Sequence, residues 1–132
     1  MDTGVQTAFQ EMLDISTDIQ KALLFTPESI LASNIEPEMQ TAALAQAQEL
    51  IRQGELKSAE AGRQPVTQLV IETPAGLVLL VKEAEAEGMV VLATGKKNSR
   101  IGLALYDLKT CIRDARTAMN PAAPSPSEGE EA

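Results

Sequence analysis

Apolar residues recur every three to four positions in three stretches of the chain, the spacing that places them on one face of an α-helix. The first stretch covers residues 3–16, and its stripe consists of Val5, Phe9, Met12 and Leu13. The second covers residues 37–60, where a proline suits the first helical turn and Gly62 is a natural stop. The third begins near Asn98 or Ser99, either of which can cap a helix. The spacing therefore predicts three helices.

Five shorter apolar runs predict β-strands. Residues 21–26 and 29–33 flank a turn at Pro27 and indicate a β-hairpin. The other three runs follow the second predicted helix and are Val66 to Glu72, Gly76 to Lys82 and Met89 to Thr94. Their short connections make the sheet antiparallel, yet the last two runs are apolar almost throughout instead of alternating. Both faces of the sheet must therefore be covered, and the helices are the available covers.

The order of elements is helix, two strands, helix, three strands, helix. This αββαβββα order predicts an α+β fold, with a five-stranded antiparallel sheet and helices on both faces. One domain is expected over residues 1–120. Pro121 should end the last helix, and residues 121–132 contain three prolines, three glutamates and no large apolar side chain. This acidic tail is predicted to be disordered, because it cannot bury enough surface to offset its ordering entropy.

Composition and charge exclude several classes of function. The chain has 19 acidic and 11 basic residues, for a net charge of −8, which argues against binding to nucleic acid or to an anionic membrane. It has no histidine and one cysteine, which excludes histidine-based catalysis, histidine metal sites and an internal disulfide. No apolar run approaches the roughly 20 residues needed to insert across a bilayer. We expect a cytoplasmic protein, since the N-terminus lacks a signal-peptide pattern.

Candidate chemistry is sparse. The segment 95–99 lies between a strand and a helix but lacks the glycine spacing and Lys-Ser/Thr pair of a phosphate loop. A solvated basic turn is the simpler interpretation, and a weakly held anion is the alternative. Glu83, Glu85 and Glu87 lack the spacing of a calcium loop and indicate an acidic hairpin tip. Cys111 falls on an apolar helix face, where cysteine behaves as a small hydrophobe. We therefore expect no catalytic residue, no cofactor and no metal.

The second predicted helix is apolar over more of its surface than one core-facing stripe requires. Its apolar and small residues are Met39, Ala42, Ala43, Leu44, Ala45, Ala47, Leu50 and Ile51. A helix of this kind implies a second buried surface, and the apolar strand beginning at Val66 would otherwise be an exposed edge. These features predict a homodimer. The expected interface residues are Ala43, Ala47, Leu50, Val66, Gln68 and Val70.

The chain resembles the roadblock/dynein-light-chain family, including its bacterial gliding-motility branch, from Thr7 to Thr117. The resemblance is carried by the element order and by the connector Lys97 to Leu103, together with the strands Gln68 to Glu72, Gly76 to Val81 and Met89 to Thr94. The first hairpin departs from the family pattern, because Thr26 to Ser29 replaces its usual Asp-Gly turn.

This resemblance implies a profilin-like αβα sandwich that homodimerises, with third strands pairing and second helices packing together. It also implies a non-enzymatic platform for small Ras-like GTPases or an adaptor subunit. We therefore predict a homodimeric regulator or scaffold that binds such a GTPase and modulates its cycle. The expected partner contacts are Gln40, Gln48 and Arg52. Two alternatives stay open: a structural adaptor of a larger complex without a GTPase, and a ligand-sensing domain of related shape.

An arginine inserted into the partner's active site could stabilise the transition state of GTP hydrolysis. The candidates are Arg52, Arg63 and Arg100. Ordinary solvated charge is the simpler interpretation of each, and repositioning of the GTPase's own residues is an equally good mechanism.

Overall fold

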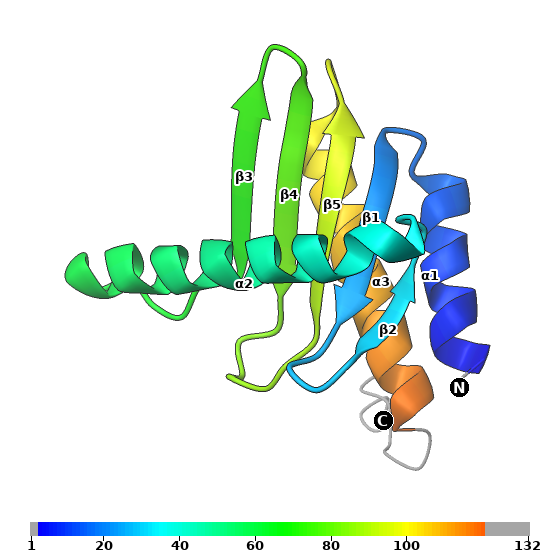
Figure 1. The fold of residues 1–132 in the computed structure, drawn as a ribbon, viewed down its shortest axis with the longest axis horizontal. Helices are drawn as coiled ribbons and strands as arrows, with labels where there is room; N and C mark the ends of the chain where they lie inside the picture. Colours follow the sequence, from blue (N-terminus) through cyan, green and yellow to red (C-terminus); the bar gives the residue numbers. More distant parts are fainter. Residues whose placement is uncertain (1–2, 121–132) are drawn as a thin grey trace, which may run out of the picture.

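The computed structural model describes residues 3–120, so the predicted tail at 121–132 lies outside the described residues. Five strands form one antiparallel sheet in the order β2-β1-β5-β4-β3, and three helices pack on it (Figure 1). The elements are α1 (Thr3–Ile15), β1 (Ile19–Phe25), β2 (Ile30–Ser33), α2 (Pro37–Glu60), β3 (Gln68–Thr73), β4 (Gly76–Lys82), β5 (Val90–Lys96) and α3 (Ile101–Met119). The predicted order, sheet and two-sided helical cover are confirmed.

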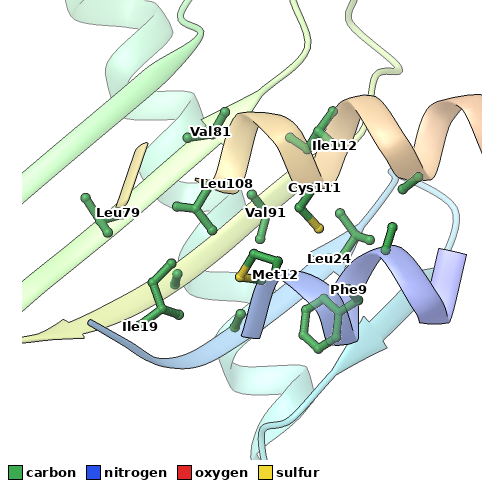
Figure 2. Close-up of a cluster of buried hydrophobic side chains, with 14 of the residues drawn as sticks. Phe9, Met12, Ile19, Leu24, Leu79, Val81, Val91, Leu108, Cys111 and Ile112 are labelled. Carbon is green, nitrogen blue, oxygen red and sulfur yellow. The ribbon is translucent and has the colours of Figure 1, made fainter. Parts of the chain in front are cut away.

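The larger core lies between the sheet and the pair α1 and α3. Figure 2 shows side chains from both helices meeting those of the strands, among them Met12, Leu79 and Leu108. Leu80, the next residue along β4, belongs instead to the smaller core under α2. Alternate residues of the central strands thus reach two different helical layers, which explains why these strands are apolar almost throughout.

Helix α2 crosses the opposite face of the sheet and makes a thinner core. Ala47 is its one buried residue, and Leu44 and Ile51 pack beside it while remaining partly exposed. At Gly54 an added Cβ would lie 3.3 Å from Leu69 Cδ1 of β3, so the glycine permits close passage of the helix over the edge strand. Figure 1 shows the C-terminal part of α2 continuing beyond β3, where no strand lies beneath it.

The start of α3 differs from the prediction. The helix begins at Ile101, and neither Asn98 nor Ser99 caps it; Arg100 occupies the N-cap position without a side-chain cap. Asn98 instead adopts a positive φ of 65° in the preceding turn. The Arg100 N–H donates to Oδ2 of Asp18, at 2.8 Å. A carboxylate 82 positions earlier thus satisfies the helix start, and a local capping pattern could not reveal it.

Several strand boundaries also shift by one or two residues. The third strand begins at Gln68 instead of Val66, and the fifth begins at Val90, one residue after Met89. Val66 and Met89 are nevertheless buried, at 7% and 0% exposure. Their side chains are apolar because they pack in the interior, although both residues lie just outside the paired strands.

Candidate functional site

Strand β3 is one of the two edge strands of the sheet, and among the described strands it pairs with β4 alone. The Lys82 N–H donates to the Thr67 carbonyl at 3.0 Å, which fixes the phase of the antiparallel ladder. Hydrogen-bonded and non-hydrogen-bonded residue pairs alternate along an antiparallel pair of strands, so the N–H and C=O groups of every second residue of β3 point away from β4. The groups that face the open edge belong to Gln68, Val70 and Glu72. Within residues 3–120 these main-chain groups pair with no other strand, and they form a row suited to adding one.

The side chains of this edge are also open. Val70 and Ile71 are 37% and 43% exposed, and they lie on opposite faces of the sheet because side chains alternate along a strand. The strand pairs in continuous register with β4, without a bulge, and Glu72 is its one charged residue. Bulges, prolines and charges are the usual protection of exposed edges, so β3 is weakly protected.

Helix α2 presents apolar surface away from its own sheet. Met39 and Leu56 are 53% and 48% exposed, and Ala42 and Ala45 also face solvent. Leu56 lies in the C-terminal part of the helix, two residues after Gly54, which passes close to Leu69 of β3. The helix and the edge strand therefore form one continuous candidate interaction surface, which we call the β3–α2 surface: the free edge of β3 and the solvent-facing side of α2.

The six predicted interface residues divide between this surface and the interior. Gln68 and Val70 lie on the free edge, and Ala43 and Leu50 are partly buried against the chain's own sheet. Ala47 has no exposed surface and Val66 only 7%, so these two have little to offer a second subunit. The sequence showed that the helix was broadly apolar but not which part of it faced the sheet.

The three predicted partner contacts all lie on α2 but have different surroundings. The Gln40 amide donates to the Ile35 carbonyl at 2.8 Å and so secures the start of α2. Gln48 is exposed and, with Ile51, lines a cavity of about 160 Å³ between α2 and the strands. Arg52 is engaged by Glu49, with Nε and Nη2 donating at 3.0 and 2.7 Å. The hydrogen bonds from Arg52 lower the pKa of the Glu49 carboxyl to about 2.

The other two candidate arginines are also accounted for within the fold. Arg100 donates through Nε to Asp18 at 3.2 Å, and Lys96 Nζ lies 3.7 Å from the same carboxylate. The Arg100 backbone hydrogen bond is the main reason that the pKa of Asp18 lies below its ordinary value. Arg63 is exposed and donates to the Gly62 carbonyl. Asp18 thus holds the basic turn before α3, and no sequence motif indicated this role.

Glu83 has a structural role that the acidic run did not indicate. Its carboxylate accepts from Arg116 of α3 at 2.7 and 3.2 Å, and from the Met89 N–H at 2.7 Å. The Arg116 hydrogen bonds hold the pKa of Glu83 below its ordinary value. Glu83 therefore closes the β4–β5 connection and joins it to α3. Within residues 3–120, no group of three or more His, Cys, Asp or Glu side chains is arranged to hold a metal ion.

Cys111 is buried at 1% exposure in the larger core, as expected from its place on the apolar face of α3 (Figure 2). Burial raises the pKa of its thiol to about 12, with a further contribution from Asp114. A thiol held in its neutral form is a poor nucleophile, so Cys111 serves packing.

Solved structures share this architecture. A Roadblock/LC7 domain from Streptomyces avermitilis matches with a TM-score of 0.72 and 13% identity, covering 83% of this chain and 92% of that one. The gliding protein MglB of Thermus thermophilus matches at 0.70 and 14%, covering 90% and 91%. Myxococcus xanthus MglB matches at 0.71 and 11%, covering 92% and 98%. The chain therefore has the Roadblock/LC7 fold, which confirms the resemblance at the level of structure.

No protein-family model and no curated protein sequence matches the chain. No helix in residues 3–120 is long and apolar enough to cross a membrane.

Proposed function

We propose that the protein is a non-enzymatic homodimeric regulator or scaffold that binds a small Ras-like GTPase and modulates its cycle. The observation that carries the proposal is the β3–α2 surface, where an unpaired strand edge lies beside an apolar helix that overhangs it. The shared fold with two MglB gliding proteins supports the same assignment.

The register of β3 suggests how two subunits would join. In a two-fold symmetric interface each subunit offers the same patch. Antiparallel pairing centred on Val70 would use all the outward main-chain groups, with Gln68 of each subunit opposite Glu72 of the other. The two sheets would then become one continuous sheet. The overhang of each α2 lies on the same side of the sheet as Ile71, so pairing would bring it over the other subunit's Ile71 and cover both.

The GTPase would be a separate chain, because segment 95–99 does not have the spacing of a phosphate loop. Pairing of two subunits would place both α2 helices on one face and create a broad platform for it. Gln40, Gln48 and Arg52, all on α2, remain our proposed contacts. Since Arg52 is engaged by Glu49, we favour repositioning of the GTPase's own residues over insertion of an arginine.

A pull-down from the native host, with and without a non-hydrolysable GTP analogue, tests the GTPase partner. Recovery of a small GTPase that depends on nucleotide would support the proposal. Recovery of a stable assembly without a GTPase would contradict it and favour the structural adaptor.

A rate measurement then tests the mechanism. With the purified GTPase, Val70→Arg should reduce the effect on hydrolysis or exchange more than Arg52→Ala. If Arg52→Ala alone removed about 10³-fold of the stimulation, as loss of an inserted arginine does, repositioning would be wrong.

A further inference from the structure

A second candidate site is the cavity of about 160 Å³ between α2 and one end of the sheet. Figure 1 shows the β1–β2 turn and the β4–β5 connection at this same end, below α2 in the view. The mouth of the cavity is formed by exposed residues of these three segments, which are Pro27, Gln48 and Ala86. Its floor is formed by buried residues, which are Phe25, Lys82, Gly88 and Val90. The cavity thus leads from solvent to a buried lysine.

Lys82 is the last residue of β4 and is only 8% exposed. Because side chains alternate along a strand, it lies on the α2 face of the sheet, like Leu80 two residues before it. Its Nζ donates to the Glu83 carbonyl at 2.8 Å and forms no ion pair within residues 3–120. That carbonyl belongs to the same connection as Ala86, so the hydrogen bond holds the ammonium at the wall of the cavity. An ammonium has three N–H groups, and lysines are rarely buried unless they are paired.

The acidic side chains of the β4–β5 connection do not supply a counterion to Lys82. Glu83, Glu85 and Glu87 line a different cavity, on the α3 side, together with Arg116. Glu83 is engaged there by Arg116 Nη2 at 2.7 Å. None of the residues that line the cavity beside Lys82 is acidic. The connection therefore presents carboxylates towards α3 and leaves a positive charge on the α2 side.

The size and lining of the cavity indicate the missing group. One ammonium balances a single negative charge, and the apolar walls suit a group with a short hydrocarbon stem. A carboxylate on such a stem accepts strong, charge-assisted hydrogen bonds from a lysine, and Gln48 at the mouth offers amide N–H donors as well. Cavities that hold small-molecule ligands typically measure about 300–1,000 Å³. A cavity of about 160 Å³ therefore suits one side chain better than a free metabolite.

We propose that this cavity, which we call the Lys82 pocket, receives the carboxylate of an aspartate or glutamate side chain from the GTPase proposed above. The inference rests on that proposed function, since Gln48, at the mouth of the pocket, is one of the three proposed partner contacts. The ion pair with Lys82 forms only in the complex. A partner with a basic or apolar residue at this position leaves the buried charge unpaired, so the pocket adds specificity to the apolar contacts of α2.

A small acid tests the pocket without the partner. Wild-type protein at neutral pH and constant ionic strength is titrated with sodium butyrate, and with n-butanol as the neutral control, while backbone amide NMR shifts are followed. Butyrate should cause saturable shifts at Gln48, Lys82 and Ala86, with a Kd on the order of millimolar, as suits a ligand this small. General attraction does not explain such shifts, because the net charge of the chain is −8. Absence of saturable shifts, or equal shifts with n-butanol, would overturn the proposal.

Two matched pairs of variants sharpen the titration. Lys82→Met removes the charge and keeps an unbranched stem, so it should weaken butyrate binding by about tenfold or more. Lys109→Met removes an equal charge from the exposed side of α3 and should change binding by less than about twofold. Ala86→Leu narrows the mouth and should also weaken binding, whereas Ala84→Leu adds the same side chain to the same connection outside the pocket. Equal effects within either pair would contradict a specific site.

Stability provides a readout that a structural role of Lys82 would move the other way. Lys82→Met should leave the Tm of the free protein unchanged or raise it, because a buried charge without a counterion is replaced by an apolar side chain. A fall of several degrees would assign the ammonium and its bond to the Glu83 carbonyl to the fold, and the pocket would lose its proposed role.

The GTPase recovered in the pull-down tests the source of the carboxylate. Its affinity for Lys82→Met should be at least about tenfold lower than for the wild type or Lys109→Met, and butyrate should compete with it. Unchanged GTPase affinity together with lost butyrate binding would make a free small acid the ligand and would exclude the partner's side chain. Failure to recover a GTPase would overturn the proposed function and this occupant with it. The butyrate titration reports on the pocket independently, so the two failures are distinguishable.

Discussion

The two faces of the sheet are built differently. On one face α1 and α3 lie side by side and bury a large core that includes Phe9, Leu79 and Leu108. On the other face a single helix, α2, covers a smaller cluster and keeps one fully buried residue, Ala47, over its 24-residue length. The first face has the contacts that hold a subunit together. The second face keeps apolar side chains of α2 exposed, and association with another chain would bury them.

The largest expected effect comes from deleting core volume on the two faces. Leu108→Ala should reduce the free energy of unfolding by about 3 kcal/mol, since Leu108 is fully buried and the α1–α3 core cannot collapse around it. Ile51→Ala should cost about half as much, because Ile51 of α2 packs against the smaller core but remains partly exposed. Urea denaturation at one protein concentration measures both.

Leu103→Ala is the matched control for this pair. Leu103 lies on α3 like Leu108 but is 44% exposed, so its loss should cost about 0.5 kcal/mol or less. Equal losses of unfolding free energy for Leu108→Ala and Ile51→Ala would show that the two faces contribute equally to stability, and would contradict the difference between them.

The next effect concerns association through the weakly protected edge. Val70→Arg should weaken the proposed homodimer by at least about tenfold, because symmetry places two like charges opposite each other at its centre. Light scattering and sedimentation across a concentration series measure the change. Leu103→Arg places the same charge on the exposed side of α3 and should leave the dimer intact. A monomeric wild-type protein at micromolar concentration would refute the dimer itself.

A smaller effect should follow from loss of the Glu83–Arg116 pair. Glu83→Gln should reduce the free energy of unfolding by about 1–2 kcal/mol at neutral pH, because it weakens a partly buried, charge-assisted pair. The pKa of Glu83 is lower in the folded protein, so its contribution is complete above the unfolded pKa of about 4.5 and is lost as the pH falls below it. Wild-type and variant stabilities should therefore converge in acid. A difference that persists unchanged below pH 4 would contradict this account.

The smallest effect is expected from the acidic C-terminal segment. Deletion of residues 121–132 should leave the Tm nearly unchanged, because the segment contains no large apolar residue that could add to either core. Thermal unfolding followed by circular dichroism measures it. A drop of several degrees in the Tm would show that this segment packs on the domain and stabilises one of the two faces of the sheet.

Local pattern was sufficient for the elements and their order. Periodicity placed the three helices, the proline turn at residues 26–29 marked the first hairpin, and apolar central strands required helices on both sides. These features follow from neighbouring residues, whose spacing alone decides which face of a helix or strand is apolar. The same pattern correctly marked Val70 as part of an exposed apolar edge.

The tertiary structure decided what depends on residues far apart in the chain. It brought Asp18 to the start of α3, joined Glu83 to Arg116, and buried Oδ2 of Asp107 where no group in residues 3–120 donates to it. It also determined that Ala47 faces the sheet while Leu56 lies exposed on the overhang. A carboxylate has the same appearance in a sequence whether it is solvated, paired or buried alone. Its role is fixed by which donors the fold places within about 3 Å of it, and that is set by the packing of whole elements.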